Sequence, residues 1–253
     1  MKNYFRCAQF AALPLALMLP LSPPIAAQVA AAPPESGITR QQADQILNEL
    51  RLIRQLLEKQ GSKEPKEELT RARLNLQGFA MLGSKDAPLT VVEFTDYQCP
   101  FCQRFHTTSF PDLKKNYIDT GKVRFYSRDM PLDFHANAMR AAEAARCAAD
   151  QGQGQFWKMR DIMGSNPDKL DLEHILGFAS DLKLDANTLR TCVETEKYKN
   201  AVQTDVLEAM KIGANATPTF VIGKSTADGV DGELMVGAMP YAMFDMKLRD
   251  LSK

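Results

Sequence analysis

The chain has 253 residues, of which 45% are hydrophobic and 25% are charged, so it can bury a core of ordinary size and is neither a disordered tail nor a fibre. Its 31 basic residues balance its 31 acidic residues, and without a global positive charge nucleic acid is not an expected partner. Five cysteines are too few for a disulfide scaffold, but they are enough for a redox pair and a structural bridge.

Residues 1–27 are predicted to be a secretory signal peptide. Lys2 and Arg6 give a positive start, residues 10–21 are apolar, and small residues at 25–27 suit cleavage. A membrane anchor is the alternative, but prolines interrupt a run far shorter than the roughly 20 residues that a spanning helix needs. We therefore expect an exported chain that loses Cys7, keeps four cysteines and begins with a flexible lead at residues 28–38.

An amphipathic helix is predicted over residues 39–61. Thr39 and Gln42 form a capping box, and Gly61 suits the end of the helix. Such a helix is marginal in water by itself, so its apolar stripe must be covered. Self-association into a homodimer or higher oligomer is one hypothesis, and packing against the chain's own domain is the other. The apolar seam consists of Ala43, Ile46, Leu50, Ile53 and Leu57.

A charged connector is predicted at residues 62–78, and a globular domain at residues 79–253. The domain opens with a β-branched run at 89–94 that predicts a buried strand. A second strand, a block of helices, two more strands and a last helix follow, with Cys192 near a loop. The expected strands are 123–129, 219–222 and 233–236, and the expected helices are 136–149, 156–163, 172–179, 198–210 and 241–251.

The segment Cys99-Pro-Phe-Cys102 follows the first strand and precedes a helical stretch. Pro100 suits the first turn of a helix, so Cys99 would lie where free amide hydrogens and the helix dipole stabilise a thiolate. Cys102, one turn deeper, could attack a mixed disulfide formed at Cys99 and release the partner. Half of a zinc site is the alternative, but no second cysteine pair follows at finger spacing. The pair therefore indicates redox chemistry.

Cys147 and Cys192 lie outside this motif. In an exported chain a structural disulfide between them is expected, and closing a loop of 45 residues would stabilise the fold by roughly 4 kcal/mol. A second redox pair remains the alternative, because the sequence does not give their separation. His106, four residues after Cys102, could influence the thiols or could simply be a polar surface residue.

Several segments taken together resemble the DsbA family of periplasmic thiol:disulfide oxidoreductases. The resemblance covers about two thirds of the chain and implies an α/β protein with a thioredoxin fold and a helical domain inserted at about residues 133–214. It also implies a location in the periplasm. The segments are Glu93 to Cys102, Arg128 to Leu132 with His135, Gln155 to Trp157, and Ala216 to Phe220.

The resemblance also implies roles for individual residues. It makes Cys99 the nucleophile, Cys102 the resolving thiol and Pro218 a cis-proline that faces them, with Thr217 offering backbone hydrogen bonds to an extended peptide. Glu93 lies where the fold usually has a buried acid, which could exchange a proton with the resolving thiol. A buried strand acid paired with a lysine is the alternative for Glu93. The predicted substrate-binding residues are Pro100, Phe101, Thr217 and Pro218.

Phe101 departs from the family pattern, because the strongest oxidants of the family carry histidine between the two cysteines. A histidine cation would stabilise the Cys99 thiolate, and phenylalanine cannot. A less oxidising site is therefore expected, so that reduction or isomerisation of substrate disulfides becomes credible. The predicted oligomer agrees with this, since periplasmic disulfide isomerases are oligomers.

Two functions follow as hypotheses. The first is an enzyme that exchanges disulfides with unfolded or mispaired exported proteins and is recycled by a membrane redox partner, either a DsbB-like oxidase or a DsbD-like reductase. The second is a binding protein that holds a soft ion such as Cu(I) between Cys99 and Cys102. The enzyme needs no cofactor and no metal.

Overall fold

The computed structural model describes residues 38–59, 70–152 and 154–253, and it divides the chain into two units, residues 1–63 and 64–253. The predicted signal peptide and most of the predicted flexible lead lie outside the described residues, as do residues 62–69 of the predicted connector. Among the described residues, no helix is both long enough and apolar enough to span a membrane.

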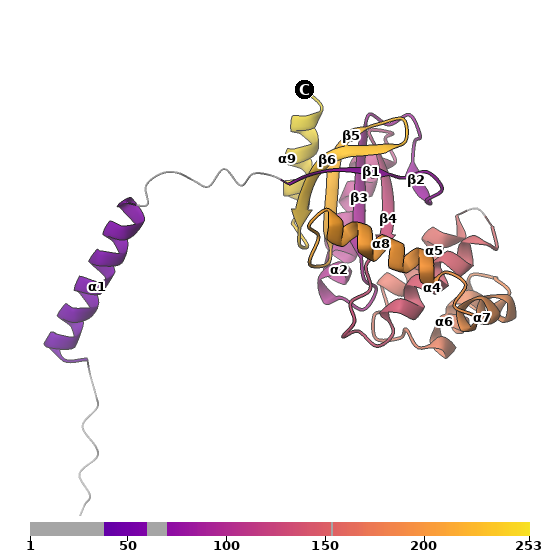
Figure 1. The fold of residues 1–253 in the computed structure, drawn as a ribbon, viewed down its shortest axis with the longest axis horizontal. Coiled ribbons are helices and arrows are strands. Elements are labelled where there is room, and N and C mark those ends of the chain that lie inside the picture. The colour runs from indigo at the N-terminus through magenta and orange to yellow at the C-terminus, as the bar shows by residue number, and fades with distance from the viewer. Residues whose placement is uncertain (1–37, 60–69, 153) are drawn as a thin grey trace, which may run out of the picture. The chain divides into compact units, whose positions relative to one another are not determined.

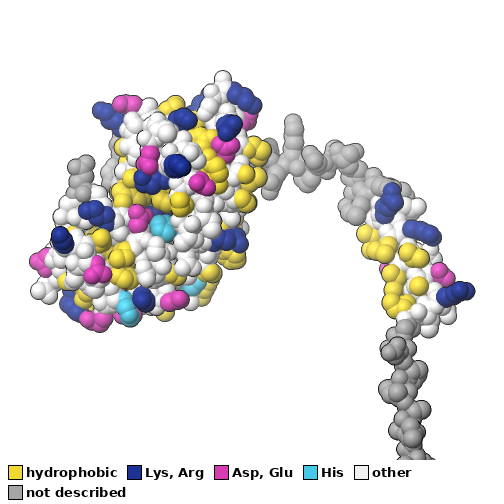
Figure 2. All heavy atoms as spheres, turned by 180° about the vertical axis from the view of Figure 1, so that it is seen from behind, with side chains coloured by type: hydrophobic (Ala, Val, Ile, Leu, Met, Phe, Trp, Pro, Cys, Tyr) yellow, Lys and Arg dark blue, Asp and Glu magenta, His cyan; other side chains and the backbone are white. Residues whose placement is uncertain are grey.

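The first unit contributes the helix α1 (Arg40–Lys59). Both hydrogen bonds of the capping box are present, from the Gln42 amide to Thr39 Oγ1 at 3.2 Å and from the Thr39 amide to Gln42 Oε1 at 3.0 Å. Figure 2 shows hydrophobic side chains along one side of α1 and basic side chains on the other. Half or more of the surface of its large apolar side chains is exposed, namely in Ile46, Leu47, Leu50, Leu52 and Ile53.

The second unit is built on a six-stranded mixed sheet with the order β1-β6-β5-β3-β4-β2 (Figure 1). The central pair β3 and β4 is parallel, and every other pair is antiparallel. β3 is buried along its whole length, as its run of β-branched residues predicts, and β4 is buried along its whole length as well. The strands are β1 (Arg71–Asn75), β2 (Met81–Gly83), β3 (Leu89–Thr95), β4 (Val123–Asp129), β5 (Thr219–Ser225) and β6 (Gly229–Val236).

Helices cover both faces of the sheet. On one face, Phe105 packs edge-on against Phe220 of β5 and close to Phe244 of the last helix. On the other face, Ala209 from the end of the helical block packs with Val92 and Phe94 of β3. The helical stretch after β3 consists of α2 (Pro100–Arg104), the π-helical turn η1 (Phe105–Ser109), α3 (Phe110–Leu113) and the π-helical turn η2 (Lys114–Ile118). The last helix is α9 (Tyr241–Leu251).

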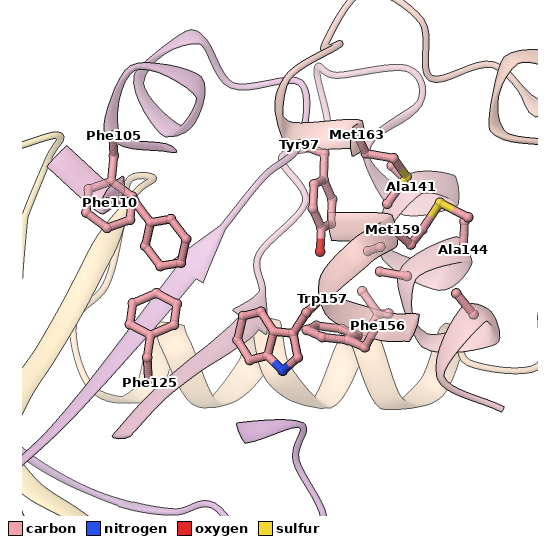
Figure 3. Close-up of a cluster of buried hydrophobic side chains, with 14 of the residues drawn as sticks. Tyr97, Phe105, Phe110, Phe125, Ala141, Ala144, Phe156, Trp157, Met159 and Met163 are labelled. Atoms are coloured by element: carbon pink, nitrogen blue, oxygen red, sulfur yellow. The ribbon is translucent and has the colours of Figure 1, made fainter. Parts of the chain in front are cut away.

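The helical insertion lies between β4 and β5, within the predicted range 133–214. Its core continues that of the sheet, because Phe125 of β4 lies between Phe110 and Trp157, with ring centroids 5.1 and 5.9 Å away (Figure 3). The Trp157 indole donates a hydrogen bond to the Met81 carbonyl of β2, at 3.2 Å. The five helices are α4 (Ala138–Ala149), α5 (Gln155–Gly164), α6 (Leu172–Asp181), α7 (Ala186–Glu194) and α8 (Lys199–Lys211).

The structure corrects two expectations about local structure. Residues 71–75, within the predicted connector, form the edge strand β1, in which alternate residues Ala72 and Leu74 are buried and the intervening ones are exposed. A sequence that is polar at every second position has the composition of a linker but the pattern of a half-buried strand. Cys192, which we expected near a loop, lies in helix α7, whose start is capped by Asp185.

Candidate active site

The two free cysteines among the described residues lie at the start of α2, directly after the central strand β3. The chain turns at Asp96, whose carbonyl accepts a hydrogen bond from the Cys99 amide at 3.1 Å. Cys99 is then the N-cap of α2, and Pro100 occupies the first helical position, where no amide hydrogen is needed. The sequence therefore fixes the first thiol at the positive end of the helix.

Cys99 is buried, with an exposed fraction of 4%, and its sulfur lies 3.5 Å from the Thr217 carbonyl oxygen. A hydrogen bond from the Cys102 thiol is the main cause that lowers the pKa of Cys99 to about 5. The amide hydrogens of Cys102 and Phe101 act in the same direction, against the effect of burial. At neutral pH the thiol of Cys99 is therefore ionised in the reduced protein.

Cys102 has the opposite properties, although it lies only one turn away. Burial raises the pKa of its thiol well above the ordinary value, and the charge of Glu93 raises it further. The Asp96 amide donates a hydrogen bond to the Cys102 sulfur at 3.4 Å and favours the thiolate, but it does not outweigh burial. The pair is thus one thiolate and one protonated thiol.

The loop before β5 faces Cys99. The bond between Thr217 and Pro218 is cis, as the family resemblance implies, and the Pro218 carbonyl accepts a hydrogen bond from the Gly237 amide at 2.7 Å. Thr217 Oγ1 is buried and has no hydrogen-bond partner within the described structure. Phe101 is 54% exposed. The guanidinium carbon of Arg104 lies over the Phe101 ring, 5.2 Å from the ring centroid. An apolar side chain therefore stands beside the thiol pair.

Glu93 lies on β3, on the face of the sheet that carries the thiols. Its Oε2 accepts a hydrogen bond from Nη2 of Arg160 at 2.7 Å, and both side chains are buried. The partner is therefore an arginine from helix α5, and not the lysine that we had considered as an alternative. Arg160 gives no local signal in the sequence, because its partner lies 67 residues earlier in the chain.

His106, for which the sequence left two interpretations, lies against the same pair of charges. Its Nδ1 accepts a hydrogen bond from Nη1 of Arg160 at 3.2 Å, because a guanidinium can only donate. Burial is the main cause that lowers the pKa of His106. With Glu93 and Cys102 it lines a small cavity of about 10 Å³, close to the volume that one water molecule needs.

Asp96 links the thiol turn to the segment that follows β4. Its buried carboxylate accepts hydrogen bonds from the amides of Gln98 at 2.7 Å and Leu132 at 2.8 Å. A third comes from Nδ1 of His135, at 2.8 Å, which carries the hydrogen because a carboxylate can only accept. In the sequence, His135 is indicated only by the family resemblance, and Asp96 gives no signal of its own.

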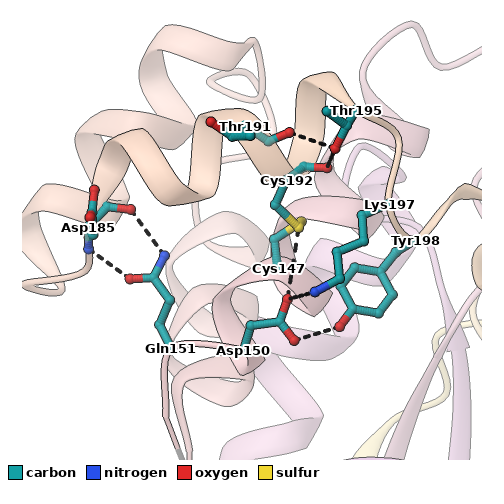
Figure 4. The surroundings of a disulfide bond; sticks show 9 residues. All are labelled: Cys147, Asp150, Gln151, Asp185, Thr191, Cys192, Thr195, Lys197 and Tyr198. Atoms are coloured by element: carbon teal, nitrogen blue, oxygen red, sulfur yellow. Dashed lines mark hydrogen bonds and ion pairs between the residues drawn. A yellow bond between two sulfur atoms is a disulfide. The ribbon is translucent and has the colours of Figure 1, made fainter.

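Cys147 and Cys192 form a disulfide that joins α4 to α7 (Figure 4). Beside it, the Asp150 carboxylate binds Lys197 Nζ at 2.8 Å and the Tyr198 hydroxyl at 2.6 Å. The bridge is surrounded by helices of the insertion and involves no residue of the thiol turn. It therefore has the position of a structural bond.

A sheet of this topology with a thiol pair at a helix start, a cis-proline loop and a helical insertion defines the thioredoxin class of proteins. A family profile described as thioredoxin matches residues 76–234. The chain belongs to the thioredoxin family, and the predicted fold and resemblance to DsbA-like proteins are confirmed by the relatives described below.

Two solved structures share the fold and a quarter of the sequence. The first is alpha-DsbA1 from Wolbachia pipientis, with a TM-score of 0.63 and 25% identity, over 70% of this chain and 92% of that one. The second is oxidised BdbD from Bacillus subtilis, with a TM-score of 0.64 and 25% identity, over 74% of this chain and the whole of that one.

Sequence relatives of two kinds are similar to the chain. "Disulfide bond formation protein D" of Bacillus subtilis (strain 168) is 31% identical over 155 residues, which are 58% of this chain and 69% of that protein. "Na(+)/H(+) antiporter NhaA 3" of Salinispora tropica is 32% identical over 169 residues, which are 66% of this chain and 25% of the antiporter. The chain thus spans only about a quarter of the length of that antiporter.

Proposed function

We propose that the protein is a thiol:disulfide oxidoreductase that exchanges disulfides with exported proteins through Cys99 and Cys102. The observation that carries the proposal is the asymmetry of the pair: a thiolate at Cys99, with a pKa of about 5, next to a buried and protonated Cys102. The thiolate is the form that attacks a disulfide, and a low pKa also makes Cys99 a good leaving group.

In the reductive direction, the Cys99 thiolate attacks a sulfur of the substrate disulfide and forms a mixed disulfide, and the second substrate thiol leaves. Cys102 then loses its proton and attacks Cys99, which releases the first substrate thiol and leaves the enzyme oxidised. In the oxidative direction the same steps run backwards, with Cys102 as the leaving thiolate.

The surface around Cys99 supports a peptide as substrate. The exposed ring of Phe101 offers an apolar contact beside the thiol, and the loop of Thr217 and Pro218 lies on the other side. An extended substrate segment that pairs with this loop would bring its cysteine to Cys99. Pro100 contributes by fixing the start of α2, and Glu93 lies close to Cys102, with which it would exchange a proton as the sequence suggests.

The location and partners are part of the same proposal. The predicted signal peptide and the DsbA-like relatives support export to the periplasm, where unfolded or mispaired proteins would be the substrates and a membrane oxidase or reductase would recycle the thiols. The exposed apolar face of α1 supports a homodimer or higher oligomer through residues 39–60.

The relatives named for disulfide bond formation favour disulfide exchange over the soft-metal binding that we considered from the sequence. The direction of exchange depends on the redox potential. Thiolate pKa values in this fold extend from about 7 in weak oxidants to about 3.5 in strong ones. A value of about 5 for Cys99 supports an intermediate potential, despite the absence of a histidine at Phe101.

Turnover and potential test the proposal together. Purified mature protein should reduce insulin catalytically with glutathione as the electron source, and it should refold scrambled ribonuclease. Its equilibrium with glutathione gives the potential: a value near about −120 mV would indicate an oxidase, and one below about −200 mV a reductase or isomerase. Stoichiometric reaction without turnover would contradict the proposed enzyme.

A further inference from the structure

The Asp96 carboxylate connects the thiol turn to a segment of the chain that the mechanism has not used. Its side chain is fully buried and takes three hydrogen bonds, of which two come from backbone amides and one from the His135 imidazole. The hydrogen bonds from Leu132 and His135 link the turn to this segment, and Gln98 adds a third link, because its Oε1 accepts a hydrogen bond from the Asn137 amide at 2.5 Å. Residues 132–137 are therefore fixed against the turn that carries Cys99.

The backbone of Asp96 also reaches the second thiol. Its amide donates a hydrogen bond to the Cys102 sulfur, and the nitrogen and sulfur atoms are 3.4 Å apart. Burial, the neighbouring Cys99 and the charge of Glu93 all raise the pKa of Cys102, whereas this amide lowers it. Among these groups it is therefore the Asp96 amide that stabilises Cys102 as a thiolate.

We infer that His135 is a positioning residue for Cys102: it holds the Asp96 carboxylate, and thereby the Asp96 amide, in place for the step in which Cys102 becomes a thiolate. The inference rests on the proposed exchange activity. In that step the Cys102 thiolate attacks the Cys99 sulfur of the mixed disulfide, an S–S bond forms between the two cysteines, and the bond from Cys99 to the substrate breaks. The electron pair leaves with the substrate sulfur, which then takes up a proton.

The first step should not depend on His135. The Cys99 thiolate is stabilised by the Cys102 thiol and the amides of α2, whereas the hydrogen bond of His135 goes to Asp96. A residue that only packs the 132–137 segment would affect stability, or both steps alike. A residue that orients the Asp96 amide affects the release step alone.

Two substitutions separate these roles. His135→Leu keeps the approximate size of the side chain and removes the donor, whereas His135→Asn keeps a donor near the position of Nδ1. The matched control is His174→Leu, because Nδ1 of His174 also binds an aspartate, Asp171, at 2.6 Å, but on the exposed start of α6. His135→Met, which also lacks a donor, replaces the leucine variant if that variant does not fold.

The experiment mixes each reduced protein with an aromatic disulfide whose thiolate is coloured, and follows the colour by stopped flow. The first thiolate is released when Cys99 attacks, and the second when Cys102 closes the enzyme disulfide. We expect the second phase to slow about tenfold in His135→Leu, or in its methionine replacement, as one charge-assisted hydrogen bond is lost. The first phase should be unchanged, and His135→Asn and His174→Leu should behave as the wild type.

Three results would overturn the inference. They are a second phase within about twofold of wild type in the donor-free variant, an equal slowing of both phases, and an equal slowing in His135→Asn. A wild-type protein that releases no coloured thiolate would instead overturn the proposed function, and this inference with it.

Discussion

The guanidinium of Arg160, on helix α5 of the insertion, lies 2.7 Å from the carboxylate of Glu93 on the central strand, and both side chains are at most 3% exposed. The guanidinium carbon also lies 4.6 Å from the ring centroid of Phe110 and 5.5 Å from that of Trp157. Arg160 therefore holds the Glu93 carboxylate in place beside Cys102, whose pKa the charge of Glu93 raises. The proton exchange between Glu93 and Cys102 that the sequence suggests stays a prediction.

This ion pair predicts strong coupling between two substitutions. Arg160→Met should lower the free energy of unfolding by about 3 kcal/mol, because it leaves a buried carboxylate without its cation. The double variant Glu93→Gln/Arg160→Met should recover most of that loss, since no buried charge remains. Denaturant unfolding of the single and double variants measures the coupling. Additive losses would show that the pair contributes no interaction of its own.

The two thiols should respond differently to removal. Cys99→Ser should abolish thiol exchange, because Cys102 is protonated at neutral pH. Cys102→Ser should still attack substrates but should accumulate mixed disulfides, because the resolving thiol is gone. Mass spectrometry after incubation with a cysteine-containing peptide distinguishes the two variants. A Cys102→Ser protein with normal turnover would exclude the dithiol mechanism.

The low pKa of Cys99 predicts a characteristic pH dependence. Alkylation of the reduced protein by iodoacetamide should be half-maximal at about pH 5 and constant above about pH 6.5. In Cys99→Ser, the remaining Cys102 should react only at alkaline pH, because its pKa is raised. A half-maximal rate near pH 8 for wild type would remove the main support for the proposed function.

The lowered pKa of Cys99 also makes the stability of the protein depend on its redox state. The pKa of Cys99 is lowered on folding, so ionisation stabilises the reduced protein above the pKa of an unfolded thiol, and this contribution is lost as the pH falls toward 5. The reduced form should therefore gain stability relative to the oxidised form as the pH rises from about 5 to about 9. Thermal unfolding of both forms across this range tests the sign, which would be opposite if Cys99 were buried as a neutral thiol.

The disulfide of the insertion should contribute to stability and not to exchange. The Cys147→Ala/Cys192→Ala variant opens a loop of 45 residues, and the chain-entropy relation gives a loss of about 4 kcal/mol in the free energy of unfolding. Insulin reduction should remain, because neither cysteine contacts the thiol turn. Loss of exchange in a variant that is still folded would instead identify the bridge as a second redox centre.

Much of the fold could be predicted from local patterns. The buried strand β3 is rich in β-branched and aromatic residues, and Cys99-Pro-Phe-Cys102 defines a helix start from proline and dipole arguments alone. β1 was missed because its alternation Arg-Ala-Arg-Leu-Asn has a connector's composition, and β2 because it is only three residues long. Strands this short are recognisable only by the partner with which they pair.

The environment of the thiols was less accessible to sequence reasoning. The partners Arg160 and His135 come from segments far along the chain from Glu93 and Asp96, and only the packing of the insertion brings them together. Nothing in a single sequence indicates which of many arginines pairs with a buried acid. The sequence therefore predicts the buried acid Glu93 but not the cation that pairs with it.

The apolar face of α1 predicts that removing this helix changes the assembly but not the thiol chemistry. The cut should fall at about residue 62, because a cut near Leu76 would also remove β1 from the edge of the sheet. The shortened protein should be a monomer in light scattering and should still reduce insulin. Isomerisation of scrambled ribonuclease should fall, because a second thiol pair held nearby raises the effective concentration for rearranging a mispaired substrate.

A substitution within the full mature chain tests whether assembly depends on the apolar seam of α1 and not merely on the presence of the helix. Leu50→Glu puts a charge into the apolar seam, on a residue that is 55% exposed in the structure, and should give a monomer with low isomerase activity. Asn48→Glu adds the same charge on the opposite side of α1 and should leave the assembly intact. A wild-type mature protein that is monomeric at micromolar concentration would contradict the predicted oligomer. An oligomer that persists in Leu50→Glu would show that another surface holds the copies together, and the case for isomerisation would then depend on the measured redox potential alone.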